Sequence, residues 1–144
     1  MKQIFFYSFD RSVDLKERTL IKNLIGGLFD AEMIVLNQVS YIFCSDKNLL
    51  KINRKYLKHN LYTDVITFLV SPKNEPVFGE VYLSTDRIKE NAKKYRVSYQ
   101  NELLRVIIHG ALHLSGFEDK TKTQREKMRK KENFYLNLFK TSST

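Results

Sequence analysis

Residues 98–119 read Ser-Tyr-Gln-Asn-Glu-Leu-Leu-Arg-Val-Ile-Ile-His-Gly-Ala-Leu-His-Leu-Ser-Gly-Phe-Glu-Asp, and the rest of the chain is best understood from this segment. Its apolar side chains fall on nearly every face of a helix, which predicts a buried, central helix. Ser98 is suited to cap the start of this helix. Gly116 is suited to end it near Ser115.

Two of the three histidines of the chain, His109 and His113, lie four residues apart in this helix. That spacing puts both imidazoles on one face, one turn apart. A tetrahedral metal ion needs nitrogens about 2 Å from one point, with the other ligands supplied from elsewhere. Because Gly116 lets the chain turn back, Asp119 is the predicted third ligand. The alternative to a metal site is two ordinary core histidines that are hydrogen-bonded to the backbone.

The spacing is that of the H-E-x-x-H-x-x-G-x-x-H signature of zinc peptidases. One position differs: Gly110 stands where a peptidase keeps the glutamate that acts as its general base. The segment therefore has the ligand frame of a metal hydrolase without the peptidase base.

Outward from this helix, strands and helices are predicted from hydrophobic periodicity and capping residues. They follow the order β-α-β-α-β-β-α-α-α, which predicts an α/β fold of the α+β kind with one mixed four-stranded sheet and helices packed on it. Asp14 with Glu17, and Thr121 with Gln124, are expected to form capping boxes. We expect a single domain over residues 1–144. The predicted strands are 3–9, 34–44, 63–70 and 77–84; the predicted helices follow Asp14, Ser45 or Asp46, Ser84, Ser98 and Thr121.

The composition is that of a soluble globular protein, with 42% hydrophobic and 28% charged residues. No apolar run reaches the roughly 18 to 20 residues of a membrane span, so no membrane partner is expected. The apolar N-terminal stretch is too short for a secretory signal because Asp10 interrupts it. A single cysteine, Cys44, excludes an internal disulfide. We expect a cytoplasmic protein.

The chain carries a net charge of +9, and its basic residues are clustered. Seven of the twelve residues from Lys120 to Lys131 are Lys or Arg. Such clusters suit a polyanion, since neutralising phosphates releases counterions. Three clusters with this net charge favour nucleic acid as a partner, although each alone could be a solvated helix face. The other two clusters are Arg87, Lys89, Lys93, Lys94 and Arg96, and Lys51, Arg54, Lys55 and Lys58.

Residues His109 to Asp119 resemble the signature H-G-x-L-H-L-x-G-[YF]-D-H of the YbeY endoribonucleases, a family of bacterial rRNA maturation factors with a zincin-like fold. Upstream, Asn53 and Tyr56 resemble the N-x-x-Y element of the family. Residues 63–68 and 79–81 resemble its T-[DN]-V-L-S-F and G-[DE]-I elements. These elements occur in the same order and span most of the chain.

Two departures from the family pattern stand out. The family usually has a third histidine where this chain has Asp119, and the family arginine that is thought to serve catalysis falls on Leu57. Lys58, His59 and Arg54 are the candidates to replace that arginine.

The resemblance implies a zinc-dependent, single-strand-specific endoribonuclease acting in small-subunit rRNA maturation and ribosome quality control. It implies RNA, as rRNA or the ribosomal subunit, as partner; no protein partner is predicted. We expect one Zn²⁺ per chain, held by His109, His113 and Asp119. Mn²⁺ or another divalent ion is compatible with a site that has one carboxylate ligand. Catalysis would run through these ligands, and Asp64 and Lys58 are further catalytic candidates.

Three classes of function stay open at this point. An RNA hydrolase is favoured by the family resemblance and the charge. A metallopeptidase-like hydrolase is favoured by the ligand spacing and disfavoured by Gly110. A ribosome-associated RNA-binding protein with a structural metal stays open because Leu57 stands where the family has the arginine that is thought to serve catalysis.

Overall fold

The computed structural model describes residues 3–142. The outermost residues of the predicted domain, 1–2 and 143–144, lie outside this range. The elements follow the predicted order, with one additional π-helical turn. The strands are β1 (Gln3–Ser8), β2 (Leu36–Cys44), β3 (Val65–Leu69) and β4 (Val77–Ser84); the helices are α1 (Arg18–Ala31), α2 (Asp46–Ile52), the π-turn η1 (Asn53–Leu57), α3 (Thr85–Tyr95), α4 (Tyr99–Leu114) and α5 (Lys122–Ser142).

The four strands form one mixed sheet in the order β1-β2-β4-β3, as predicted. β1 and β4 both run parallel to β2, whereas β3 and β4 form an antiparallel hairpin. Because side chains alternate along a strand, Tyr41 and Val81 point to one face, and Ile42 and Tyr82 point to the other. The sheet therefore has an inner face, which carries the main core, and an outer face.

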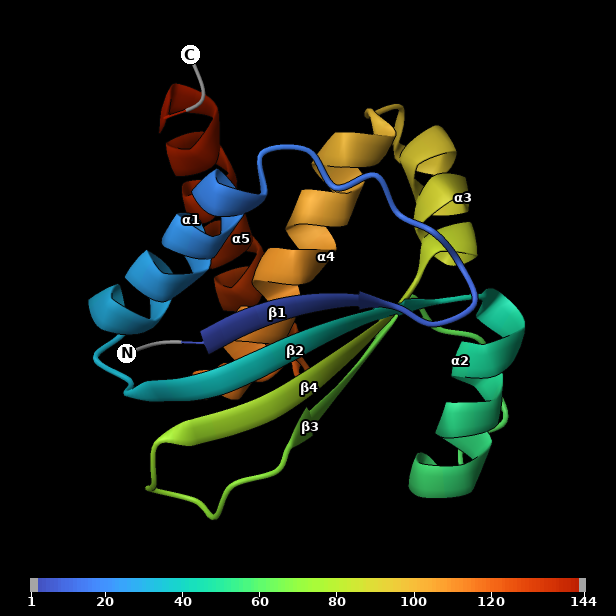
Figure 1. The fold of residues 1–144 in the computed structure, drawn as a ribbon, viewed down its shortest axis with the longest axis horizontal. Coiled ribbons are helices and arrows are strands. Elements are labelled where there is room, and N and C mark those ends of the chain that lie inside the picture. The colour runs from blue at the N-terminus through green and yellow to red at the C-terminus, as the bar shows by residue number, and fades with distance from the viewer. Residues whose placement is uncertain (1–2, 143–144) are drawn as a thin grey trace.

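Helices α1, α3, α4 and α5 lie together on one side of the sheet, and α2 lies beyond it at the end of the strands (Figure 1). The main core fills the space between those helices and the inner face of the sheet. A smaller cluster, Cys44, Leu49 and Ile66, joins α2 to the outer face. This arrangement makes α4 the central helix, as its apolar sequence predicts.

The capping residues of three helices are confirmed. The hydroxyls of Ser45 and Ser98 accept hydrogen bonds from backbone N–H groups three residues on, at the starts of α2 and α4. Thr121 and Gln124 form the reciprocal bonds of a capping box before α5.

The predicted cap at Asp14 is wrong. The residue before α1 is Glu17, which has a left-handed backbone (φ 57°) and no capping side-chain bond. Leu15 is buried in the core, so the chain reaches the helix by turning from this anchor rather than from Asp14.

The helix predicted to follow Ser45 is present, but it changes geometry after Ile52. Leu49 and Leu50 are buried in α2, but the chain then widens into the π-turn η1, where Tyr56 is 60% exposed. The buried Asn53 amide donates a hydrogen bond to the Leu61 carbonyl, 2.9 Å away. This bond draws the loop after η1 back over the turn.

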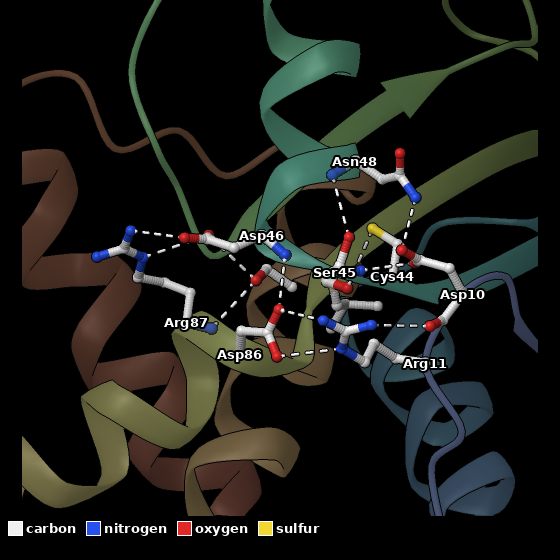
Figure 2. Close-up of polar contacts among 10 residues, drawn as sticks. Asp10, Arg11, Cys44, Ser45, Asp46, Asn48, Asp86 and Arg87 are labelled. Atoms are coloured by element: carbon white, nitrogen blue, oxygen red, sulfur yellow. Dashed lines mark hydrogen bonds and ion pairs between the residues drawn. The ribbon is translucent and has the colours of Figure 1, made fainter.

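Charged side chains connect α2 and α3 at their N-termini (Figure 2). The carboxylate of Asp10 accepts a 2.7 Å hydrogen bond from the Ser45 backbone, and Asp86 accepts a 3.0 Å bond from the Asp46 backbone. Asp46 in turn pairs with Arg87 at 2.8 Å. These carboxylates satisfy the free N–H groups at helix starts.

Among residues 3–142, no helix combines the length and the apolar character needed to cross a membrane.

Candidate metal centre

Helix α4 presents His109 and His113 on the same face, as their spacing predicts. The centroids of the two imidazole rings are 4.6 Å apart, and both side chains are mostly buried. Just beyond the helix, Gly116 adopts φ +111°, a left-handed backbone that favours glycine. The amide of Phe117 bonds back to the Leu112 carbonyl at 3.0 Å, so the chain reverses direction and returns Asp119 to the histidines.

The three side chains converge on one point. Asp119 Oδ2 lies 3.4 Å from His109 Nε2 and 3.2 Å from His113 Nε2. One ligand atom from each of these residues lies within 4.8 Å of the others. Ligand atoms about 2 Å from a tetrahedral ion are separated by about 3.3 Å, so the two measured separations fit a single divalent metal.

Glu132 on α5 fixes the orientation of His109. Its carboxylate accepts a 2.7 Å hydrogen bond from His109 Nδ1, which leaves Nε2 directed at the site. Arg105 donates to the other carboxylate oxygen at 3.0 Å. A carboxylate behind a histidine ligand sets the tautomer and the ring orientation that a metal requires.

The electrostatics of this pair favour the charged carboxylate. Burial raises the pKa of Glu132, but the bonds from His109 and Arg105 outweigh it and hold that pKa below its ordinary value. Burial lowers the pKa of His109, while Glu132, Asp119 and Asp64 raise it, with a net upward shift. The pair is a buried, hydrogen-bonded support for the ligand set.

Sequence reasoning missed Glu132, although the sequence contains a signal for it. It stands within the buried stripe of α5 at the helical spacing of its apolar residues, and it is only 5% exposed. A charged residue within an apolar stripe is almost always paired, and the face that carries this stripe packs against other elements, so a partner there was to be expected. The stripe is Met128, Glu132, Tyr135, Leu136 and Phe139.

Two cavities meet at the ligands. The first, of about 220 Å³, lies among α3, α4 and α5, and the second, of about 520 Å³, runs along β3 and the loop after η1. Asp64, His109 and Asp119 line both. A linear substrate could therefore pass from one cavity into the other across the ligand set.

Asp64, a catalytic candidate from the sequence, lies at this junction. Burial raises the pKa of Asp64, and the charge of His109 partly opposes that rise. Its Oδ2 accepts a 3.3 Å hydrogen bond from the Asn91 side chain. A buried carboxylate beside the cluster, with its pKa raised, is a candidate for proton transfer.

The other candidates occupy different places. Lys58 ends the η1 turn with a left-handed backbone and is exposed; it does not line either cavity within the described range. Its catalytic role stays a prediction. Leu57 and His59 line the second cavity. Two acidic residues of the family-like elements lie elsewhere: Glu80 is on the outer face of the sheet beside Tyr82, and Glu118 is exposed in the turn.

Gly110 faces the sheet. A Cβ at this position would lie 2.7 Å from Cγ1 of Val81, closer than a real Cβ contact. The position where a zinc peptidase carries its glutamate is therefore filled by close contact between α4 and β4, with no room for a side chain.

These features define an α/β protein in which two histidines of the central helix and an aspartate of the following turn form a cluster that could hold a metal ion, open to two cavities. The chain matches the family described as Endoribonuclease YbeY over residues 7–140, and it belongs to that family.

Relatives cover nearly the whole chain. It is 40% identical over 137 residues to Endoribonuclease YbeY of Cytophaga hutchinsonii, with 95% of this chain and 96% of that protein covered. It is 45% identical over 126 residues to Endoribonuclease YbeY of Chlorobium limicola, covering 88% of this chain and 83% of that protein.

A solved structure has the same fold. The solution structure of TM1509 from Thermotoga maritima superposes with a TM-score of 0.62 at 28% identity, covering 99% of this chain and 93% of that one. The predicted fold class, with its mixed four-stranded sheet, is confirmed.

Proposed function

We propose that this chain is a zinc-dependent, single-strand-specific endoribonuclease that acts in small-subunit rRNA maturation and ribosome quality control. The observation that carries the proposal is the convergence of His109, His113 and Asp119, at separations that fit one metal ion, in a chain of the YbeY family. Its partners would be RNA and the ribosomal subunit, and its location the cytoplasm.

The residues of the chain divide the work. His109, His113 and Asp119 would hold the ion, and Glu132 keeps the His109 ring in its ligating orientation. Such an ion, when bound, polarises a phosphoryl oxygen and makes water nucleophilic near neutral pH. Asp64, which lines both cavities, is the candidate to accept a proton there.

The ligand set also bears on metal preference. Two neutral imidazoles and one carboxylate leave a net charge of +1 on a divalent centre, whereas three histidines would leave +2. We infer a somewhat weaker Lewis acid that accepts Mn²⁺ alongside Zn²⁺.

A nuclease assay on an rRNA fragment with single-stranded and double-stranded regions tests this function. Purified protein should carry about one metal ion per chain. It should cut only single-stranded regions, lose activity with chelator and recover it with Zn²⁺ or Mn²⁺. His113→Ala should abolish both metal and cleavage. Stoichiometric metal in that variant would refute the site.

The same preparation separates the alternatives. Chelator-sensitive casein cleavage that vanishes in His109→Ala would favour a metallopeptidase. Tight RNA binding and stoichiometric metal without any RNA cleavage would favour a ribosome-associated binding protein with a structural metal. We expect neither, and for the peptidase the reason is the absence of a carboxylate at Gly110.

A further inference from the structure

The two cavities that meet at the metal ligands differ in charge. Arg105, Arg125 and Arg129 line the first. Among the described residues that line the second, none is lysine or arginine. A substrate that crosses the ligand set would therefore meet guanidinium groups on one side of the reacting centre and none on the other.

The basic run that precedes and opens α5 is divided by the faces of that helix. Arg125 and Arg129, one turn apart, line the first cavity. Lys127 and Lys131 turn to another flank, where their ammonium groups each lie 5.5 Å from the centre of the Phe117 ring. Lys131 also pairs with Glu32 at 3.0 Å. Basic residues that form one cluster in the sequence therefore lie on different faces of α5 and contact different parts of the molecule.

The three arginines of the cavity are not equivalent. Arg105 is engaged, because it donates to Glu132 and to Asn133, both at 3.0 Å. Arg125 and Arg129 are exposed at the mouth. Arg125 is held there by a 2.8 Å hydrogen bond to the Lys120 carbonyl, and the contact of Arg129 with Glu132 is long, 3.8 Å.

The acidic groups of the cavity do not cancel these two charges. Glu132 is compensated by Arg105 and His109, and Asp119 belongs to the ligand set. Glu102 is only 4% exposed, and Asp64 lies at the junction with the second cavity, where it accepts a hydrogen bond from Asn91. An anion approaching from solvent meets the arginines first.

We propose that Arg125 and Arg129 form a subsite for the backbone phosphates of single-stranded RNA on one side of the cleavage point. The proposal rests on the proposed function and adds a direction to it: the strand is held by its phosphates on the α5 side only. Two guanidinium groups suit this role, since each can bind phosphate oxygens in a bidentate manner without reading the base.

Salt-dependent binding tests the subsite. The probe is a labelled single-stranded RNA of about 12 nucleotides, long enough to cross both cavities. Phosphorothioate linkages keep its charge and resist hydrolysis, so the metal-loaded protein can be used. The double variant Arg125→Gln/Arg129→Gln is compared with Lys127→Gln/Lys130→Gln, which removes the same charge from the same helix.

Loss of two phosphate contacts should reduce the slope of log affinity against log salt by about 1.4, which is about a 25-fold loss of affinity at roughly 0.1 M salt. The lysine pair should change affinity less than threefold or so. Arg125→Lys/Arg129→Lys keeps the charge and should keep most of the slope. Because the lysine variant replaces the same two side chains, it also shows whether a loss in the glutamine variant comes from the charge or from misfolding.

Two results would overturn the subsite. One is that the arginine pair and the lysine pair lose the same amount of RNA affinity on change to glutamine, in a chain that binds RNA when unaltered. That result would mean that α5 attracts RNA as a diffuse positive surface, without a defined subsite. An unaltered chain that does not bind the RNA would refute the proposed function itself, and the subsite with it.

Discussion

The carboxylate of Glu132 lies 2.7 Å from Nδ1 of His109, although the two residues belong to different helices and stand 23 positions apart. Arg105, one turn before His109 in α4, donates a 3.0 Å hydrogen bond to the same carboxylate. The candidate metal site is therefore supported by the packing of α4 against α5, and the orientation of His109 depends on a residue of the last helix.

Glu132→Gln should weaken metal binding about 10- to 100-fold, because the amide cannot hold the His109 ring in the same charged hydrogen bond. Competition with a chromogenic chelator measures the affinity. Glu126→Gln, exposed on the same helix, is the control. If Glu132→Gln lowers the melting temperature but leaves Zn²⁺ affinity within about threefold, Glu132 is a structural residue and does not position the ligand.

Asp119→Ala should lose most of the metal affinity, since Oδ2 of Asp119 is the atom that faces both imidazoles. Asp119→Asn keeps the shape of the side chain but removes its negative charge, so it should still lose much of the metal affinity. Asp119→His should retain the metal and favour Zn²⁺ over Mn²⁺.

Isothermal titration with each ion, alongside melting temperature, checks the Asp119 series. A site completed by water instead of Asp119 predicts the opposite pattern. In that case Asp119→Ala would be destabilised by about 1 kcal/mol with metal affinity intact, as for loss of a helix cap.

Gly110→Ala should destabilise the fold by about 1 kcal/mol. The new methyl group would overlap Val81 on β4, a cost that exceeds the gain in helix propensity. Gly27→Ala is the matched control, because nothing lies within 4 Å of its added Cβ; it should stabilise by roughly 0.5 to 1 kcal/mol. Urea denaturation measures both. Stabilisation of both variants would mean that α4 can move off the sheet.

Asp86→Asn tests the pH dependence of stability. The hydrogen bond from the Asp46 backbone, together with Arg11, lowers the pKa of Asp86 below its usual value. A carboxyl whose pKa is lower in the folded state stabilises the fold above its unfolded pKa, near 3.9, and loses that contribution as the pH falls through the folded value.

The expected deficit of Asp86→Asn is about 1 kcal/mol at pH 7, after allowance for the partial exposure of the side chain. It should shrink below about pH 4. Denaturation across pH 3 to 7 or so, with Glu75→Gln in the β3–β4 loop as control, measures it. A deficit that is constant over this range would contradict the ionic origin.

The sequence alone determined the features that depend on near neighbours in the chain. Residues four apart share a helix face, so His109 and His113 had to lie together. Gly116 permits the left-handed turn that returns Asp119 to them. The caps at Ser98 and Thr121 were predictable for the same reason. The predicted cap at Asp14 is wrong because Leu15 is buried against residues that are distant in the sequence, and this contact sets where the chain enters α1.

Only the tertiary structure decided which long-range partners complete the site. Glu132 reaches His109 because α5 packs on α4, and Asp64 is brought to the ligands by the position of β3 at the edge of the sheet. The basic run of residues 120–131 is uniform in sequence, yet packing assigns Arg125 and Arg129 to the cavity and Lys131 to Glu32. Periodicity specifies which residues share a face, but the neighbour that each face meets depends on how the helices and the sheet pack to bury their apolar surfaces.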